Sequence, residues 1–317
     1  MAKFLEVREA SVSFSGKPAL SNVSLAVGGA HPAITAVVGE SGSGKTTLIR
    51  MLLGFQTPTT GTVIYDGQPL PKMSGAAQKL FRREVQAIFQ DPFDAFNPFY
   101  KIDHPLLAPL KTFGISASRD ESYDRIEKTL RSVGLNPAQT LGKYPHQISG
   151  GQRQRVMIAR ALLLEPEIIL ADEPVSMVDA SLRSTILEIL YELNRSRGIS
   201  LIYVTHDLTT AYQVAHSIVV LHGGQIMEVG ATEQVIHDPA HLYTRSLIEA
   251  VPSPDPDTPW NLDVATQPFA PPKGQVLLYP TGPERAVAAP VRPGEAAVTA
   301  AQVQLAVSQA KADALAS

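Results

Sequence analysis

The chain has 317 residues, with 27 Lys and Arg against 30 Asp and Glu, and it contains no cysteine. A net charge of -3 gives no basic surface, so no nucleic-acid partner is expected. The lack of cysteine excludes disulfides, thiolate zinc sites and cysteine-bound iron–sulfur clusters. The N-terminus lacks the apolar segment of a signal peptide, and no window reaches the roughly 20 apolar residues that span a bilayer. We therefore expect a soluble cytoplasmic protein.

The N-terminal region predicts strands followed by a glycine-rich loop. Residues 4–14 and 23–27 alternate apolar and polar side chains, which indicates antiparallel strands. Residues 34–38 form a short, mostly apolar run that passes through the glycine-rich loop into a helix over residues 48–53. A strand, a glycine loop and a helix in this order form the unit in which a phosphate-binding loop functions.

Further along the chain, the same alternation of strand and helix returns. Strands are predicted at residues 168–171 and 201–205, with an amphipathic helix between them that ends near Gly198. Residues 218–221 and 225–229 predict a hairpin. Strands that alternate with helices favour an α/β fold with a mainly parallel sheet, next to an N-terminal antiparallel β part. With the glycine loop between strand 34–38 and helix 48–53, this arrangement resembles a P-loop NTPase core.

Two segments differ in composition from this core. Residues 91–166 contain no apolar β-branched strand and have their clearest helix at 120–133, which predicts an inserted helical subdomain. Prolines cluster after the core, so we expect one large domain over residues 1–251 and a Pro/Ala-rich, partly irregular extension over residues 252–317. Within that extension, residues 298–316 predict a terminal helix.

The glycine-rich loop at residues 39–46 reads G-E-S-G-S-G-K-T and matches the phosphate-loop pattern G-x-x-x-x-G-K-T. Glycines let backbone N–H groups turn toward phosphate oxygens, and the following helix adds its positive end. In such a loop Lys45 reaches the β- and γ-phosphates and Thr46 ligates Mg²⁺. This spacing arises by chance in roughly one random chain in a hundred, so we predict that the chain binds a nucleotide. The predicted contacts are Gly39, Glu40, Ser41, Gly42, Ser43, Gly44, Lys45, Thr46 and Thr47.

An acidic pair follows the predicted strand at 168–171. Buried carboxylates need a compensating cation, because an unpaired buried charge costs several kcal/mol. We therefore hypothesise that Asp172 holds Mg²⁺ and that Glu173 polarises the attacking water. The alternative interpretation is an ordinary solvated pair that caps a helix.

Residues 148–152 read I-S-G-G-Q and precede a predicted helix. Ser149 and the glycine N–H groups therefore lie at a helix N-terminus, where an anion can bind. Taken alone, the same residues are equally compatible with a simple helix cap. At this position, a short helix's length ahead of the acidic pair, they resemble the signature of the ABC (ATP-binding cassette) ATPases.

The other landmarks of that family occur in the expected order over residues 3–251. Phe14 resembles the aromatic residue that stacks on adenine, although tyrosine is usual there, and a core aromatic is the alternative. Gln90 resembles the loop glutamine that senses Mg²⁺ and the attacking water, and His206 resembles the switch histidine that contacts the γ-phosphate. Residues 176–179 resemble the family's Ser-Ala-Leu-Asp loop. The resemblance implies a nucleotide site of Phe14, the phosphate loop, Ser149, Gly150, Gly151, Gln152 and Asp179, catalytic groups Lys45, Gln90, Glu173 and His206, and metal ligands Thr46, Gln90 and Asp172.

The resemblance also implies a dimer and a membrane partner. In this family two ATPase subunits, identical or merely similar, bind head to tail, and each ATP lies between the phosphate loop of one and the signature of the other. The present chain has one copy of each motif, which agrees with the need for a second subunit. Lacking a membrane span, it resembles a separate ATPase subunit that associates with two transmembrane permease subunits at the cytoplasmic face of the inner (plasma) membrane.

Two further segments resemble the oligopeptide/dipeptide importer ATPases. Residues 90–100 resemble their Q-D-P-x-x-x-x-N-P segment, and residues 237–247 resemble their C-terminal hallmark. The resemblance implies an importer that receives its solute indirectly, through a solute-binding protein, and takes up a peptide or a related solute such as an oligosaccharide or nickel. A cluster within the first segment is a candidate groove for the permease, or else part of the helical core: Phe93, Phe96, Phe99 and Tyr100.

Three other classes remain as alternatives. The ATPase subunit of an ABC exporter is the main one, and the importer-like segments disfavour it. A soluble ABC ATPase of DNA repair or translation would normally have paired cassettes, a long coiled coil or a basic surface. A P-loop kinase would account for residues 39–46 and leave Ser149 and His206 without a role.

Overall fold

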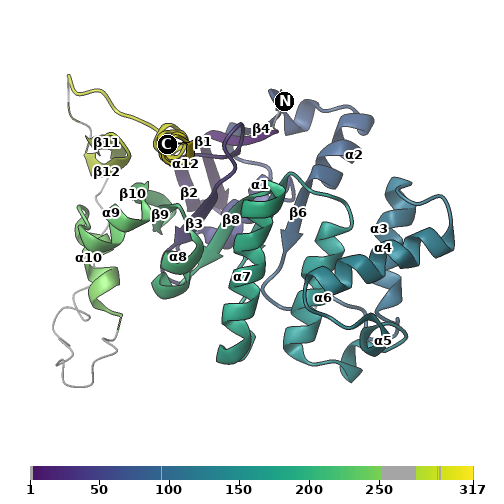
Figure 1. Cartoon of the computed structure of the whole chain (residues 1–317). Coiled ribbons are helices and arrows are strands. Elements are labelled where there is room, and N and C mark those ends of the chain that lie inside the picture. The colour runs from purple at the N-terminus through teal and green to yellow at the C-terminus, as the bar shows by residue number, and fades with distance from the viewer. Residues whose placement is uncertain (1–2, 94, 252–275, 291, 293, 317) are drawn as a thin grey trace, which may run out of the picture. The chain divides into compact units, whose positions relative to one another are not determined.

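A computed structural model describes residues 3–93, 95–251, 276–290, 292 and 294–316 (Figure 1). The chain divides into two compact units. The first consists of Met1–Pro71 together with Ile202–Ser317, and the second of Lys72–Leu201. The phosphate loop therefore belongs to the first unit, and the I-S-G-G-Q segment to the second.

The first unit contains a four-stranded antiparallel sheet in the order β2-β1-β4-β5. Strands β1 (Phe4–Phe14) and β2 (Lys17–Gly28) form the predicted antiparallel pair. Strand β4 (Thr60–Tyr65) pairs with the other side of β1, and β5 (Gln68–Pro69) pairs with β4. The alternating apolar residues of β1 are buried, which is why this stretch of sequence forms a strand with one covered face. Strand β2 begins at Lys17, earlier than predicted, because Lys17 pairs with Phe14 directly across the turn.

The second sheet of this unit carries the phosphate loop. Its strands run in the order β11-β12-β10-β9-β3-β8. Strand β3 (Ile34–Val38) pairs in parallel with β9 (Ser217–His222), and β9 forms the predicted hairpin with β10 (Gln225–Ala231). Every residue of β3 is buried, as is every residue of β8 (Ser200–Thr205), which fits strands covered on both faces. The unit also contains α1 (Lys45–Leu52), α8 (Leu208–Val214), α9 (Thr232–His237) and α10 (Leu242–Glu249).

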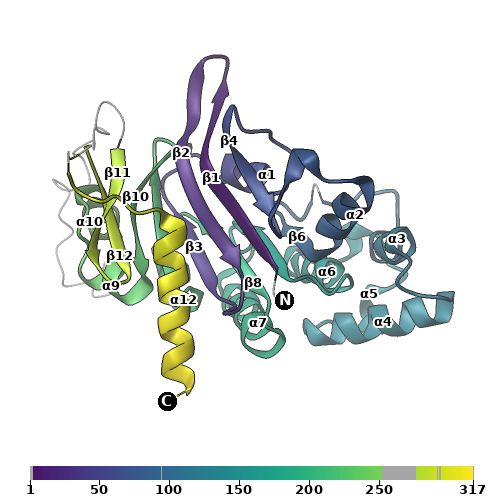
Figure 2. The same ribbon diagram turned by 90° about the horizontal axis from the view of Figure 1, so that it is seen from above.

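The C-terminal extension forms a hairpin that the sequence did not predict. Strands β11 (Val276–Gly282) and β12 (Arg285–Pro290) pair with each other, and β12 also pairs with β10. The predicted terminal helix is confirmed as α12 (Ala300–Ala316), which lies along β2 (Figure 2). Short strands without clear alternation become stable when they extend an existing sheet, and a local sequence pattern does not report that partner.

The second unit combines a small parallel sheet with helices. Strand β6 (Val85–Ile88) pairs in parallel with β7 (Ile168–Asp172). Among the described residues between 91 and 166 every regular element is helical, as predicted, whereas β6 is too short to stand out in the sequence. The α-helices are α2 (Gly75–Glu84), α3 (Asp103–Phe113), α4 (Arg119–Ser132), α5 (Pro137–Thr140), α6 (Gly150–Leu162) and α7 (Ala180–Arg197), and short 3-10 turns occupy Leu70–Lys72 and Pro145–Gln147.

Candidate nucleotide-binding site

The phosphate loop joins β3 to α1, and its shape depends on glycine. A Cβ at Gly39 would lie 2.1 Å from the carbonyl oxygen of Leu221, so no other residue fits there without a backbone shift. Gly44 has φ +106 and a Cβ there would lie 2.6 Å from the carbonyl oxygen of Ala19. Gly44 occupies the N-cap position of α1, and no side chain caps the helix there. Backbone N–H groups at such a helix start can bind an anion.

Lys45 and Ser43 place polar groups inside this loop. The Lys45 side chain is buried, and its ammonium donates to the carbonyl oxygens of Gly39 at 2.7 Å and Glu40 at 2.8 Å. The Ser43 hydroxyl is buried and makes no hydrogen bond within the described structure. A buried hydroxyl without a partner is costly unless a ligand satisfies it, and a phosphate oxygen is a suitable acceptor. The loop therefore fits a nucleotide phosphate.

The acidic pair lies at the end of β7 in the second unit. Asp172 is the last residue of the strand and is buried, and Glu173 follows in the left-handed conformation with φ 44. The Gln90 side-chain amide donates to the Glu173 carboxylate at 3.0 Å, across 83 residues of sequence. A non-glycine residue in this conformation costs about 1–3 kcal/mol and persists only where its surroundings hold it. Here the Ser176 N–H and hydroxyl both donate to the Glu173 carbonyl oxygen, at 3.2 and 2.9 Å.

The I-S-G-G-Q segment forms the predicted helix start. Ser149 caps α6: its hydroxyl accepts from the Gln152 N–H at 3.2 Å, and the Gln152 side chain accepts from the Ser149 N–H at 2.9 Å. Ser149 and Gln152 therefore form a reciprocal capping box at the predicted helix start. Gly151 packs closely, because a Cβ there would lie 2.4 Å from the Leu182 side chain. Ser149 itself remains exposed at the surface of the second unit.

The remaining predicted site residues occupy exposed loops or strand ends. Phe14 ends β1 and is 49% exposed, so it is not a core aromatic. His206 is exposed between β8 and α8, next to Asp207, whose carboxylate caps α8 by accepting from the Thr209 N–H at 2.9 Å. Asp179 is exposed at the N-cap position of α7. Phe14, the phosphate loop and His206 thus belong to the first unit, whereas the acidic pair, its glutamine, the capping box and Asp179 belong to the second.

The aromatic cluster divides between core and surface. Phe96 is buried, whereas Phe93, Phe99 and Tyr100 are 53%, 85% and 50% exposed, so the core interpretation holds only for Phe96. The guanidinium of Arg153 lies 4.1 Å from the centre of the Phe93 ring. Asp94 of the same segment lies outside the described residues.

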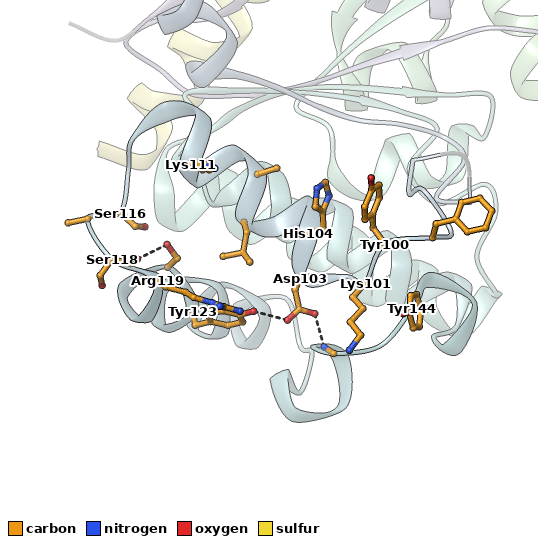
Figure 3. Close-up of a pocket in the computed structure, with 16 residues that line it drawn as sticks. Tyr100, Lys101, Asp103, His104, Lys111, Ser116, Ser118, Arg119, Tyr123 and Tyr144 are labelled. Atoms are coloured by element: carbon orange, nitrogen blue, oxygen red, sulfur yellow. Dashed lines mark hydrogen bonds between the residues drawn. The ribbon is translucent and has the colours of Figure 1, made fainter.

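Tyr100 lines a pocket of about 910 Å³ in the second unit (Figure 3). Its ring stacks on His104 at 4.3 Å between centres. The Asp103 carboxylate fixes one wall of this pocket, because it accepts from the Tyr123 hydroxyl at 3.0 Å and from the Gly142 N–H at 2.7 Å. The pocket therefore combines exposed aromatic rings with a preformed polar wall.

One contact of the phosphate loop was not foreseen from the sequence. The N–H of Glu40 donates to the hydroxyl of Tyr243, across 203 residues. Tyr243 lies in the segment 237–247 that the sequence marks as distinctive, but no spacing or composition signal relates that segment to residues 39–46. The pairing arises only when α10 folds back toward β3.

Two family models match the chain. Residues 20–176 match a model described as ABC transporter, and residues 227–272 match one described as oligopeptide/dipeptide transporter, C-terminal region. The oligopeptide transport ATP-binding protein OppF of Escherichia coli (strain K12) is 39% identical over 267 residues, which cover 81% of this chain and 80% of OppF. The chain belongs to the ABC transporter ATPases. Part of the C-terminal match, residues 252–272, lies outside the described residues.

Solved ABC transporter ATPases share the fold. The cbiO1 structure from Clostridium perfringens, part of the ABC transporter complex cbiONQ, aligns with a TM-score of 0.65 at 25% identity and covers 77% of this chain and 94% of cbiO1. The ATP-binding cassette MJ0796, solved as a dimer bound to ADP and Pi, aligns with a TM-score of 0.64 at 28% identity. The alignment covers 72% of this chain and 98% of the MJ0796 chain. In the described part of this ABC transporter ATPase, no helix is both long and apolar enough to cross a bilayer.

Proposed function

We propose that the chain is the ATP-hydrolysing subunit of a multi-subunit ABC importer that takes up oligopeptides, dipeptides or a related solute such as an oligosaccharide. The observation that carries this proposal is the match of residues 227–272 to the oligopeptide/dipeptide transporter C-terminal region, on a chain that also has the ATPase motifs. An exporter remains the alternative, and that same C-terminal match argues against it.

In the nucleotide site, we assign binding to the phosphate loop and hydrolysis to the groups at the end of β7. Lys45 binds the β- and γ-phosphates, Phe14 stacks on adenine and His206 contacts the γ-phosphate. Glu173 polarises the attacking water. The Gln90 side-chain amide, which donates to the Glu173 carboxylate at 3.0 Å, supports it in this role. Phosphoryl transfer depends mainly on such positioning and on stabilisation of charge.

We assign Mg²⁺ binding to Thr46, Gln90 and Asp172, and the ion would neutralise the developing phosphate charge. The donor set fits this ion, since all three side chains offer oxygen atoms and Asp172 is a carboxylate at a strand end. Among the described residues, no three His, Asp or Glu side chains form a ready-made metal cluster. Mg²⁺ that binds with one carboxylate commonly takes its remaining ligands from substrate phosphates and water.

We further propose that the working form is a head-to-tail dimer with a similar or identical subunit. One phosphate loop and one I-S-G-G-Q segment occur per chain, so Ser149, Gly150, Gly151, Gln152 and Asp179 would serve a nucleotide held by the other subunit. Two permease subunits would bind at the cytoplasmic face of the membrane, and the exposed rings Phe93, Phe99 and Tyr100 offer an apolar surface for them. A solute-binding protein would act on the permeases rather than on this chain.

The substitution Glu173→Gln tests the catalytic assignment. It removes the negative charge while it keeps the shape of the side chain and its reach toward Gln90. We expect ATP to bind with unchanged affinity and hydrolysis to fall by about 10²–10³-fold, the usual effect of losing one stabilising group in a transition state. Glu165→Gln is a matched control, because Glu165 belongs to the same unit and also has a positive φ, of 52. Normal hydrolysis by the Glu173 variant would contradict the assignment.

Uptake assays test the importer assignment and the cargo. Cells that lack this subunit should regain uptake of a labelled short peptide when supplied with the wild-type chain or the Glu165 control, but not with Glu173→Gln. The same cells should be assayed with a labelled oligosaccharide and with nickel, which separates the related cargoes. Loss of solute export, with uptake of all three unchanged, would support the exporter alternative instead.

A further inference from the structure

We propose that Tyr243 is a positioning residue for the phosphate loop, through which helix α10 sets the affinity for nucleotide. The inference rests on the nucleotide site proposed above. The Tyr243 hydroxyl accepts a hydrogen bond from the N–H of Glu40, the second residue of the loop, at 3.4 Å. Tyr243 is 2% exposed, so its hydroxyl replaces water as the partner of that N–H.

The same loop has a second support from the β9–β10 turn. The N–H of Gly224 donates to the carbonyl oxygen of Ser43 at 3.0 Å. The Tyr243 ring also lies against the ring of His222, which belongs to the start of this turn, with 4.1 Å between their centres. Tyr243 and the turn thus hold the loop at two points, Glu40 and Ser43, and the ring contact joins the two supports.

A buried carboxylate fixes the start of α10 and hence the position of Tyr243. Glu228 of β10 is fully buried, and it accepts from the N–H groups of Ala240 at 3.1 Å and His241 at 3.0 Å. His241 then caps α10 by accepting from the Tyr243 N–H at 3.1 Å. Burying a carboxylate is costly unless it is hydrogen-bonded, so the two N–H groups and Glu228 hold one another in a defined geometry.

The tyrosine stays neutral at physiological pH. The pKa of Tyr243 is raised from 10.0 to about 12, because burial and, to a smaller extent, the Glu40 carboxylate raise it by more than the hydrogen bond from the Glu40 N–H lowers it. The pKa of His241 is lowered, first by burial and then by His222. A neutral phenol keeps a lone pair for the Glu40 N–H and adds no negative charge beside a site that binds phosphate.

The position of these residues links the contact to the C-terminal region. Glu228, His241 and Tyr243 all lie within residues 227–272, the part of the chain that matches the oligopeptide/dipeptide transporter C-terminal region. None of them has a place in the catalytic assignment above. The geometry points to a role in preorganisation: a loop already held in its binding shape loses less conformational freedom when the nucleotide binds.

Tyr243→Phe tests the proposal, because it removes the hydroxyl and keeps the ring that lies against His222. We expect the Kd of the full-length chain for ADP, measured by titration calorimetry, to increase roughly three- to tenfold, as for one lost neutral hydrogen bond. Tyr279→Phe is the matched control: Tyr279 is 4% exposed, lies in the same unit, and its hydroxyl accepts from the Arg292 N–H at 2.6 Å. The control should leave the Kd unchanged.

Hydrogen exchange of the Glu40 amide gives a readout that does not need nucleotide. Exchange in the peptide that covers residues 38–44 should accelerate in Tyr243→Phe and not in Tyr279→Phe. An unchanged or tighter Kd for Tyr243→Phe would overturn the proposal, as would an equal weakening by both variants, which would indicate general destabilisation. If the wild-type chain binds no ADP, the proposed function fails, and the exchange rates still decide whether Tyr243 holds the loop.

Discussion

We expect His216 to make the stability of the first unit dependent on pH. Its Nδ1 accepts from the Ile34 N–H at 2.9 Å, and its Nε2 contacts the Lys311 ammonium group of α12. Burial, then the charge of Lys311, lowers the pKa of His216 from 6.5 to about 4. The pKa of Lys311 is also lowered by burial. Protonating His216 would thus place a second cation in a pocket of about 420 Å³ that also contains Lys311.

The size of the effect follows from these pKa values. The unfolded chain binds the His216 proton below about pH 6.5, whereas the folded chain binds it only near pH 4. The contribution to the free energy of unfolding is therefore complete above pH 6.5 and is lost as the pH falls toward 4. A difference of about 2.5 pKa units corresponds to about 3 kcal/mol in full, of which about 2 kcal/mol is lost by about pH 5.

Urea unfolding at about pH 7 and about pH 5 measures this loss, with His216→Asn as the comparison. The Asn side-chain oxygen can accept from the Ile34 N–H, but it does not titrate. All other groups titrate alike in the two proteins, so the wild type should lose about 2 kcal/mol more than the variant between these pH values. Equal losses in both proteins would refute the reasoning, because they would show that His216 is not the titrating group.

Three further substitutions test local packing and hydrogen bonding in the first unit. Gly39→Ala should lower the free energy of unfolding by about 3 kcal/mol and abolish nucleotide binding, since its Cβ would lie 2.1 Å from the Leu221 carbonyl oxygen. Gly42 has φ +82, but a Cβ there would meet open space. For Gly42→Ala, thermal unfolding should therefore show a smaller loss of stability, of about 1–2 kcal/mol. Equal losses in the two variants would contradict the predicted clash at Gly39. Gln304→Leu removes the acceptor for the buried Ala26 N–H, which destabilises the fold, and it also removes the unpaired Gln304 amide nitrogen, which offsets part of that cost. Urea unfolding should therefore show a net loss of stability of about 1 kcal/mol, and a gain in stability would contradict this expectation.

Features that depend on neighbouring residues could be predicted from the sequence. Two such features are the phosphate loop at residues 39–46 and the cap formed by Ser149 and Gln152. In each, the residues that interact lie only a few positions apart, so their spacing in the sequence is enough to predict the feature. The strands at residues 34–38 and 168–171 were recognised because a continuous apolar run is long enough to show burial on both faces. Strand β6, with four residues, is too short to give such a signal.

Contacts between distant residues were decided only by the tertiary structure. The Gln90–Glu173 hydrogen bond spans 83 residues, the Glu40–Tyr243 bond 203, and the Ala26–Gln304 bond 278. The family resemblance placed Gln90 and Glu173 in one site but not their contact, and it gave no role to Tyr243 or Gln304.

The amino-acid sequence by itself determined the chemistry: a loop for phosphate, an acidic pair at a strand end and a capped helix. The tertiary structure decided how these groups are held, including the left-handed Glu173 and the support of the phosphate loop by α10. The physical reason is that hydrogen-bonding capacity belongs to each residue, whereas the partner that satisfies a buried group depends on which segments the folded sheet brings together.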